Sequence, residues 1–341
     1  MIADPLTFPT ASRIVLEATL APITGSRFQP TGFPNLGAAE FVTPDGQQHV
    51  LVESPQSVAN RLEATAWDNA AGDLVAQLRG LPYVRTVVEG VPTDSIREAH
   101  RLNSPFLRAI VEPLRARAEI RVTQKSKKAA KSADDGDAAA VVEDSTSVDY
   151  RKLAAAVFAY DPNSVLHGVF LEKLVGLARL TRVLSGFIEA HDVRMVASGG
   201  VKNDRLDPSG KRYKNDAGKG GAEVGFGNVP FARTEYTAKP IVASFSLDLA
   251  LLRSYGLPEA AQALLVALGL WKVQRFLLSG LRLRTACDLE VVDGGLRVRR
   301  PEGFTVPTLE TLEETLPQLI AACRKAGLFV DPAITEVKFG A

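Results

Sequence analysis

The stretch RIVLEATL at residues 13–20 decides the fold class of this chain, because every second residue in it is apolar. The apolar positions on one face of the extended chain are Ile14, Leu16, Ala18 and Leu20. The opposite face carries a glutamate and a threonine. A period of two is typical of a strand with one face on a core, so we predict a half-buried strand here.

A hairpin and a helix follow in the chain. The runs AEFVT (39–43) and HVLVES (49–54) flank the sequence PDGQ, whose Asp-Gly pair favours a hairpin turn. A helix is expected from Pro55, because proline suits the first helical position and Ser54 can cap it.

Later segments repeat these signals. IVASFSLDLALL (241–252) is predicted to be a strand that turns alternate residues inward: Ile241, Ala243, Phe245, Leu247 and Leu249. TRVLSGFIEA (181–190) and LRLRTACDLEVV (281–292) are two further predicted strands. The helix after Pro258 is apolar nearly all round its first half and should be buried. This order of elements predicts an α+β fold, an antiparallel sheet with helices on one face.

Four segments depart from this pattern. SIREAHRLNSPFL (95–107) is expected to be a helix that its proline disturbs or ends. The glycine pair 294–295 should turn the last strand into the following LRVRR. Segment 124–148 has a basic block, then an acidic block and no apolar periodicity, so we expect a mobile surface loop. Residues 199–238 should form a long irregular insertion, which in a compact domain is usually functional or disordered.

Composition narrows the class of protein without naming a function. The 341 residues include 40 Lys and Arg against 39 Asp and Glu, so any nucleic-acid contact must come from local basic patches. The 46% of apolar residues suffices for one large domain or two average ones. Cys287 and Cys323 are too few for a disulfide framework, which favours the reducing cytoplasm. The most apolar stretch, 264–278, is interrupted by Lys272 and Arg275 and is too short to span a bilayer.

The most suggestive chemistry lies between residues 25 and 61. A glycine-bounded loop, GSRFQPTGFPNLG, has no carboxylate and contains Arg27, Gln29, Thr31 and Gly32. The next helix begins with the donors Ser54, Gln56 and Ser57, and Arg61 lies one turn further. Free backbone N–H groups, a helix N-terminus and these side chains suit a phosphate backbone. An ordinary helix cap preceded by turning glycines explains the same residues equally well.

Basic residues elsewhere leave alternatives open. Arg282 and Arg284 share a strand face, where they can grip successive phosphates or pair with nearby carboxylates. The insertion 199–238 is weakly basic and rich in glycine. The lysines of 124–148 could touch phosphates, but a solvated charge run is the simpler account.

Catalytic patterns are scarce. No Walker A motif, GxSxG elbow, dinucleotide fingerprint or HExxH pair is present in the sequence. The four histidines lie far apart and are expected to be structural: His49, His100, His167 and His191. DPNSVLHG (161–168) could form a small polar site, although DPNS is also an ordinary turn and cap. We predict no catalytic residue, no metal and no cofactor.

Eight blocks of sequence carry a family resemblance over about residues 13–290. They are GSRFQPTGFPNLGAAE, ESPQSVANRLE, EAHRLNSP, DPNSVLHGVFL, FIEAHDV, SGGVKND, GNVPFARTEYTA and LRLRTACDLE. In this order they resemble the repeat-associated mysterious protein (RAMP) backbone subunit of the type I-G CRISPR surveillance complex, or Cascade, formerly type I-U. Any one block alone is weak, but eight in register are specific.

The resemblance implies a single palm domain over 1–341, built on an RNA-recognition-motif (RRM-like, ferredoxin-like) fold with insertions. A finger-like helical insertion would occupy about 55–180, a thumb about 199–238 and a C-terminal extension 294–341. Such cytoplasmic, non-catalytic subunits stack along CRISPR RNA with further copies of themselves and with other Cascade subunits. They present the guide for pairing with target DNA.

The resemblance also implies a set of RNA-binding residues. ESPQSVANR would hold guide phosphates through Ser54, Gln56, Ser57, Asn60 and Arg61. In the thumb, Lys202 and Arg233 would bind phosphates, and Val201 or Phe231 would wedge between nucleotides. The predicted strands offer few aromatic side chains for base stacking, so a grip on the backbone is favoured.

Three rival functions remain open. A type III backbone subunit cleaves target RNA with an aspartate in the loop after its first strand, and loop 24–38 here contains no Asp or Glu. A small-molecule enzyme would use His167 and His100. A self-assembling protein that binds no RNA is the third.

Overall fold

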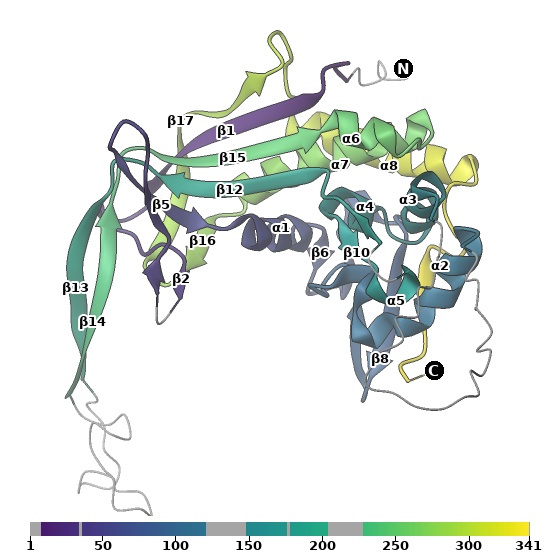
Figure 1. Cartoon of the computed structure of the whole chain (residues 1–341), viewed down its shortest axis with the longest axis horizontal. Coiled ribbons are helices and arrows are strands. Elements are labelled where there is room, and N and C mark those ends of the chain that lie inside the picture. Colours follow the sequence, from purple (N-terminus) through teal and green to yellow (C-terminus); the bar gives the residue numbers. More distant parts are fainter. Residues whose placement is uncertain (1–7, 34–35, 121–147, 176–177, 204–227, 341) are drawn as a thin grey trace, which may run out of the picture.

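A seven-stranded antiparallel sheet forms the centre of the structure (Figure 1). The computed structural model describes residues 8–33, 36–120, 148–175, 178–203 and 228–340. Within this part the sheet order is β16-β17-β1-β15-β12-β5-β4. The strands are β1 (Arg13–Pro22), β4 (Glu40–Val42), β5 (Gln48–Glu53), β12 (Leu184–Ala190), β15 (Ile241–Asp248), β16 (Leu281–Arg284) and β17 (Cys287–Arg300). The fold is a mixed α+β fold around this curved sheet.

The strands β1 and β15 lie side by side in the middle of the sheet, with Arg13 opposite Asp248 and Leu20 opposite Ile241. Alternate residues of both strands are buried, and these are the residues that the sequence pattern turned inward: Ile14, Leu16, Ala18, Leu20, Ile241, Ala243, Phe245 and Leu247. Residues of the opposite face, such as Glu17 and Ser244, are half-buried. The predicted strand at 13–20 is therefore confirmed, and the one predicted at 241–252 is confirmed only as far as Asp248, because residues 249–254 form a helix.

Helices pack on the buried face of the sheet. They are α1 (Pro55–Ala64), α6 (Leu249–Ser254), α7 (Glu259–Leu278) and α8 (Leu309–Lys325). α7 contacts β15, β16 and β17, and α8 packs on α7. By length and composition alone α7 could cross a membrane, but 72% of the apolar window is buried inside the fold, as in a core helix. The predicted burial of the helix after Pro258 is confirmed.

A second group of elements lies between α1 and β12 in the chain, and we call residues 67–180 the finger region. Its strands are β6 (Trp67–Asp68), β7 (Asp73–Leu74), β8 (Tyr83–Val88), β9 (Val91–Asp94), β10 (Val169–Phe170) and β11 (Arg179–Leu180). Its helices are η1 (Ala76–Leu78), η2 (Arg101–Asn103), η3 (Pro105–Ile110), α2 (Val111–Arg117), α3 (Tyr150–Tyr160), α4 (Pro162–His167) and α5 (Glu172–Val175). The predicted surface loop 124–148 lies outside the described residues, except for Val148.

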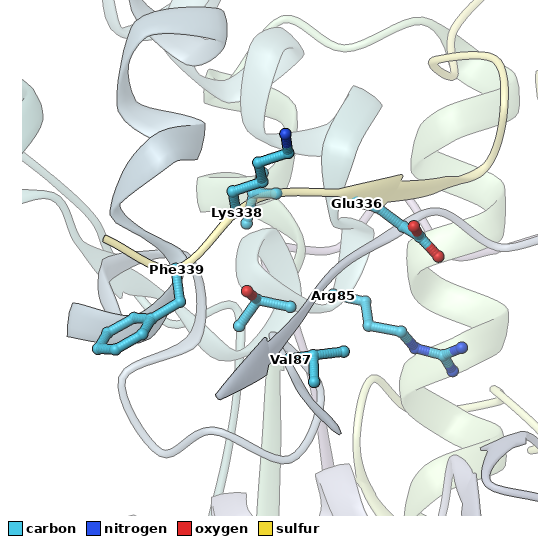
Figure 2. Close-up of a pocket in the computed structure, with 7 residues that line it drawn as sticks. Arg85, Val87, Glu336, Lys338 and Phe339 are labelled. Carbon is cyan, nitrogen blue, oxygen red and sulfur yellow. The ribbon is translucent and has the colours of Figure 1, made fainter. Parts of the chain in front are cut away.

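The C-terminal strand β18 (Ile334–Glu336) joins the finger region to the rest of the chain. It pairs in parallel with residues 83–85 of β8, and Val337 N–H donates to the Arg85 carbonyl at 2.9 Å. Figure 2 shows side chains of β8 and of the C-terminal segment around a hollow of about 410 Å³. After β17 the chain forms α8, which packs on α7, and then β18, which packs on β8. This C-terminal segment therefore connects the helical layer with the finger region.

A two-stranded ribbon projects from one end of the sheet (Figure 1). It consists of β13 (Arg194–Asn203) and β14 (Asn228–Thr237), paired without a break from Arg194 opposite Thr237 to Asn203 opposite Asn228. The expected irregular insertion at 199–238 is therefore wrong for the described residues, and residues 204–227 lie outside them. The two backbones of the ribbon approach closely at Gly199, and glycine allows this because it has no side chain. A Cβ at Gly199 would lie 2.3 Å from the Phe231 carbonyl oxygen.

The prediction of a helix at 95–107 is wrong. The chain instead makes the short 3-10 helices η2 and η3, and Pro105 begins η3 rather than ending a helix. Arg101 has a φ of 53°, which no α-helix contains, and its guanidinium forms an ion pair with Glu63. Ser104 then caps η3 by accepting from Phe106 N–H. Tertiary contact at Arg101 thus overrides the local helical pattern.

The glycine pair 294–295 does not reverse the chain. β17 continues through it and stays paired with β1, while the register jumps from Thr19 opposite Val292 to Ala18 opposite Leu296. Residues 293–295 all have positive φ and form a bulge. The predicted hairpin into LRVRR is therefore wrong, whereas the hairpin between β4 and β5 is confirmed.

Candidate nucleic-acid interface

The glycine loop after β1 is held by three different elements. Phe28 forms a two-way backbone bridge with Tyr236 at the base of the ribbon. Gln29 N–H donates to the Ala286 carbonyl at 2.7 Å, and Thr31 N–H donates to the Val52 carbonyl at 3.0 Å. Those three N–H groups are therefore not free for a phosphate, contrary to the sequence expectation. The loop acts instead as a rigid support for its side chains.

A cleft of about 660 Å³ opens between this loop, the ribbon base and β16. Five residues of the predicted RNA-binding set line it: Gln29, Thr31, Gly32, Arg233 and Arg284. They come from three segments far apart in the sequence, so the fold brings together what the sequence could place only separately. Glycine is required at position 32, because a Cβ there would lie 2.6 Å from the Gly37 carbonyl oxygen in the hairpin of β2 (Gly32–Phe33) and β3 (Gly37–Ala38).

Apolar side chains and one carboxylate complete the cleft. Leu36 and Met195 line it and are 81% and 69% exposed. The Tyr236 hydroxyl donates to the Glu40 carboxylate, and burial, together with this bond, raises the pKa of Tyr236 to about 12. The loop 24–38 has no carboxylate, but Glu40 lies just beyond it. Its negative charge is directed toward the tyrosine hydroxyl.

Arginines from two sides meet at Gln29. The Arg284 guanidinium donates to the Gln29 carbonyl at 3.1 Å, and Arg233 reaches the Gln29 amide oxygen at 3.5 Å. Arg27 lies on the same face of the ribbon as Arg233, where it donates to Ser198 and pairs with Glu235 at 3.4 Å. Arg27, Arg233 and Arg284 therefore surround the loop, and each of the three has at least one protein partner.

Glu53, at the end of β5, is the residue that the sequence interpretation missed. Its carboxylate is 2% exposed and accepts from Ser57, Arg61 and Arg284, three members of the predicted RNA-binding set. For Arg284 the open alternative of pairing with a carboxylate is therefore realised. No local pattern announces this cluster, because 231 positions separate Arg284 from Glu53. We call Glu53, Ser57, Arg61 and Arg284 the Glu53 cluster.

The net charge of the Glu53 cluster still favours the binding of an anion. Two guanidinium groups share one carboxylate, so the cluster carries a net positive charge. The Arg61 and Arg284 side chains are 31% and 24% exposed, whereas the carboxylate is almost fully covered. Guanidinium groups have five donors each, so both retain donors for a second acceptor. The outer side of the cluster can therefore bind a phosphate.

The cap predicted at the start of α1 is confirmed. Ser54 caps the helix by accepting from Ser57 N–H at 3.3 Å. Gln56 donates to Asn60 at 3.1 Å and accepts from Arg182 at 3.0 Å. Arg182 also donates to the Pro55 carbonyl at 2.9 Å, which adds a cation beside the helix start. Sequence reasoning missed Arg182, since it precedes β12 and is far from α1 in the chain.

The remaining predicted residues lie apart from the cleft. Val201 and Phe231 are 62% and 46% exposed near the outer half of the ribbon. Strand alternation places Val201 on the ribbon face of Met195 and Phe231 on the opposite face, where Arg233 lies over its ring at 5.3 Å. Lys202 belongs to β13, and its side chain lies outside the described part of the structure. Arg282 is exposed on β16.

Of the two histidines proposed for a small-molecule enzyme, only His167 lies in the core. His167 is 1% exposed, and its Nε2 lies 3.0 Å from the Lys272 ammonium, which also donates to Asn163 at 2.6 Å. Burial lowers the pKa of His167 well below its ordinary value and lowers that of Lys272 to about 8. His100 is exposed on a loop. Within the described ranges, no three or more His, Cys, Asp and Glu side chains are grouped so that they could hold a metal.

Comparison with known families identifies the chain. The family described as "CRISPR-associated protein GSU0053" matches residues 14–195, more than half of the sequence. The chain belongs to this family. The match confirms the CRISPR-associated resemblance carried by the eight blocks, and it covers β1, the glycine loop, α1 and the finger region. No curated protein matches this CRISPR-associated protein.

Solved structures show only distant similarity to this CRISPR-associated protein. A chain of "CRISPR RNA-guided surveillance complex, pre-nicking" is 16% identical, with a TM-score of 0.42 over 94% of this chain and 89% of that one. Csc2 of Thermofilum pendens is 11% identical, with a TM-score of 0.30 over 93% of this chain and 78% of that one. TM-scores this low do not indicate a function, so the function is inferred from the residues of the site.

Proposed function

We propose that this protein is a CRISPR RNA-binding backbone subunit of a type I-G Cascade complex. It oligomerises along the guide spacer in the cytoplasm and presents the guide for pairing with target DNA. The observation that carries the proposal is the cleft, in which Gln29, Thr31, Arg233 and Arg284 converge from three segments. Their donors suit a sugar-phosphate backbone, and family membership supplies the biological context.

The strand order supports an RRM-like palm. β1, α1, β12, β15, α7 and β17 follow one another as β-α-β-β-α-β, and four of the strands lie in the order β17-β1-β15-β12. Both orders are those expected of a ferredoxin-like fold, which supports the proposal. The finger region, the ribbon as thumb and the C-terminal extension are then additions to the palm. Because β17 stays paired with β1 as far as Arg300, we begin the extension after that residue rather than at residue 294. Since α1 packs against β12 and α7, we assign α1 to the palm rather than to the finger insertion.

The first test of this function is co-purification. Expression with a CRISPR array should yield the protein bound to a small RNA of discrete length, and electron microscopy should show an RNA-threaded filament. A filament without RNA would instead support the self-assembly rival. Recovery of the free protein alone, with other Cascade subunits present, would contradict the proposal.

The second test locates the RNA on the protein. Replacing both Arg61 and Arg284 with alanine should weaken binding of single-stranded RNA and lower its salt slope by roughly 0.7 for each phosphate that is no longer neutralised. Unchanged affinity and slope would show that RNA binds another face.

The third test concerns catalysis. Purified protein should leave RNA and DNA intact in Mg²⁺ or Mn²⁺, because the loop 24–38 offers no carboxylate to a metal. The first carboxylates after this loop in the sequence are Glu40, which Tyr236 engages, and the exposed Asp45. Cleavage that Glu40→Gln or Asp45→Ala abolishes would favour the type III rival.

A further inference from the structure

A second hollow lies beyond the Glu53 cluster, and we call it the Arg275 hollow. It measures about 230 Å³ and is formed by the last turns of α1 and α7 and by Leu283 of β16. Arg61 and Arg275 line it from two sides. The predicted RNA-binding set contains Arg61 but not Arg275, so the proposed function does not account for this hollow.

The Glu53 cluster connects the cleft with this hollow. Arg284 lines the cleft and shares the Glu53 carboxylate with Arg61. Arg61 in turn lines the hollow and donates to the Leu283 carbonyl, which belongs to its wall. A chain of contacts therefore runs from Gln29 through Arg284, Glu53 and Arg61 to the hollow without a gap.

Of the arginines along this path, Arg275 has the weakest interaction with a carboxylate in the described part of the chain. Its ion partner in the described part of the chain is Glu313 at 3.8 Å, and the two side chains are 45% and 26% exposed. Ion pairs this long and this exposed contribute little. The guanidinium also lies 5.9 Å from the centre of the Trp271 ring. It can therefore turn toward an anion in the hollow at small cost.

The hydroxyl groups in the hollow cannot replace the arginines as donors. Thr65 donates to the Leu62 carbonyl at 2.7 Å, and Ser279 donates to the Phe276 carbonyl at 3.0 Å. Since these hydroxyl hydrogens are used within the helices, a ligand of the hollow would meet two guanidinium groups. Such a pair suits a phosphate, which accepts forked hydrogen bonds.

We propose that the Arg275 hollow binds a phosphate group, namely the guide RNA phosphate next to the one held at the cleft. The inference rests on the proposed function and extends it, because it adds Arg275 to the RNA-binding residues. The guide strand then runs from the ribbon base across the Glu53 cluster to the end of α7. Free phosphate offers the same chemistry, so the experiment must separate the two sources.

The salt dependence of RNA binding tests the contact. Arg275→Gln in the full chain should lower the slope for an unstructured single-stranded RNA by roughly 0.7, with the melting temperature measured alongside. The double variant Arg61→Gln and Arg275→Gln should lower it by about twice that amount. Arg13→Gln is the matched control, since Arg13 is also an exposed arginine in an ion pair, at the other end of β1. It should leave the slope unchanged.

Tryptophan fluorescence gives an independent readout. The chain has two tryptophans, so Trp67→Phe leaves the emission of Trp271, beside Arg275, to be followed alone. Adding RNA should change this emission, and Arg275→Gln should abolish the change. Inorganic phosphate at the same concentration of phosphate groups should change it far less. An equal response to both would show a site for free phosphate and overturn the guide assignment.

The outcomes separate failure of this inference from failure of the proposed function. If wild type binds no RNA, the proposed function itself is wrong. If wild type binds and Arg61→Gln lowers the slope while Arg275→Gln does not, only the hollow is wrong. A lower melting temperature for Arg275→Gln with an unchanged slope would mean that Arg275 merely offsets the negative end of the α7 dipole.

Discussion

Glu53 shows how a carboxylate can belong to a site that binds anions. It is almost fully buried, and its oxygens accept from two arginines and from the Ser57 hydroxyl. A buried carboxylate is costly alone, but it is tolerated when it is paired and fully hydrogen-bonded. In return it fixes the directions of Arg61 and Arg284, which would otherwise be long flexible side chains. Their outer N–H groups then face a ligand with little further loss of entropy.

Replacing Glu53 with glutamine should change both the stability of the fold and its affinity for RNA. The shape stays the same, but two ion pairs are removed, so the free energy of unfolding should fall by about 1–3 kcal/mol. The freed arginines should raise RNA affinity at low salt and steepen the salt slope, since the local positive charge increases. Chemical denaturation and RNA titration measure both. Glu17→Gln, which removes a carboxylate from a more exposed pair with Arg299, is the control. A flatter slope in Glu53→Gln would contradict the predicted gain in RNA affinity and would mean that the orientation of Arg61 and Arg284 by Glu53 outweighs its negative charge.

Lys272 predicts a pH dependence of stability. Burial lowers the pKa of its ammonium to about 8 in the fold, against 10.5 for an ordinary lysine, although Glu63 and Asp161 act in the opposite direction. Between these two values the unfolded chain binds more protons than the folded one, so stability contributed by this group rises with pH. The gain begins near pH 8 and is complete near pH 10.5.

The measurement compares wild type with Lys272→Met by denaturation across this pH range. Wild type should gain stability relative to the variant as pH rises, because other titrating groups are common to both proteins. The exposed Lys152, changed to methionine, serves as the control and should show no such trend. If wild type instead loses stability relative to Lys272→Met as the pH rises, the lowered pKa of Lys272 is refuted.

At the scale of elements, sequence predicted what local periodicity and capping decide. The alternation in β1 and β15 and the cap at Ser54 depend on neighbours in the chain, and the structure confirms them. The ribbon was missed because its glycines suggest irregular backbone, whereas here they allow close strand pairing. The Glu53 cluster and the tie of Phe28 to Tyr236 join residues about two hundred positions apart, and no local pattern indicates such contacts. The RNA-binding roles of the predicted residues stay predictions.

The ribbon should set the spacing of subunits along the guide. Replacing residues 199–232 with an Asn-Gly turn keeps the ribbon base, including Arg233 and the bridge of Tyr236 to Phe28. The variant should remain folded by thermal melting and should still bind RNA through the cleft. Nuclease footprinting of bound guide RNA should lose its periodic protection, which wild type should show. Periodic protection that persists in the variant would mean that contacts between palms set the spacing.

At the scale of the whole molecule, the finger region is held at both of its ends and also through β18. α1 and β12 join it to the sheet in sequence, while β18 completes its three-stranded sheet beside β8. A further contact joins the Arg324 guanidinium of α8 to the Gly80 carbonyl at 2.7 Å. The finger region is therefore not a freely hinged lobe, and its orientation toward the central sheet depends on the segment after residue 300.

Truncation after residue 331 should loosen the finger region selectively. The Tyr83 N–H then loses its acceptor, the Ala333 carbonyl, and the β8 edge loses its parallel partner. Hydrogen exchange should accelerate at residues 83–85, and the melting temperature should fall. Amides of β1 and β15 serve as the internal reference and should keep their protection. Unchanged exchange at 83–85 would show that β18 does not stabilise β8.

The parallel pairing of β8 with β18 has a consequence for synthesis on the ribosome. The paired residues Tyr83 and Ile334 are 251 positions apart, and at about 5–20 residues per second β18 emerges roughly ten seconds or more after β8. During that interval one edge of β8 has no partner, and the exposed Val87 lies two residues beyond the stretch 83–85 that β18 pairs with. An unpaired apolar edge is a hazard for aggregation. Nascent chains of this protein are therefore most in need of chaperone protection at the finger, well after the glycine loop and α1 have been made.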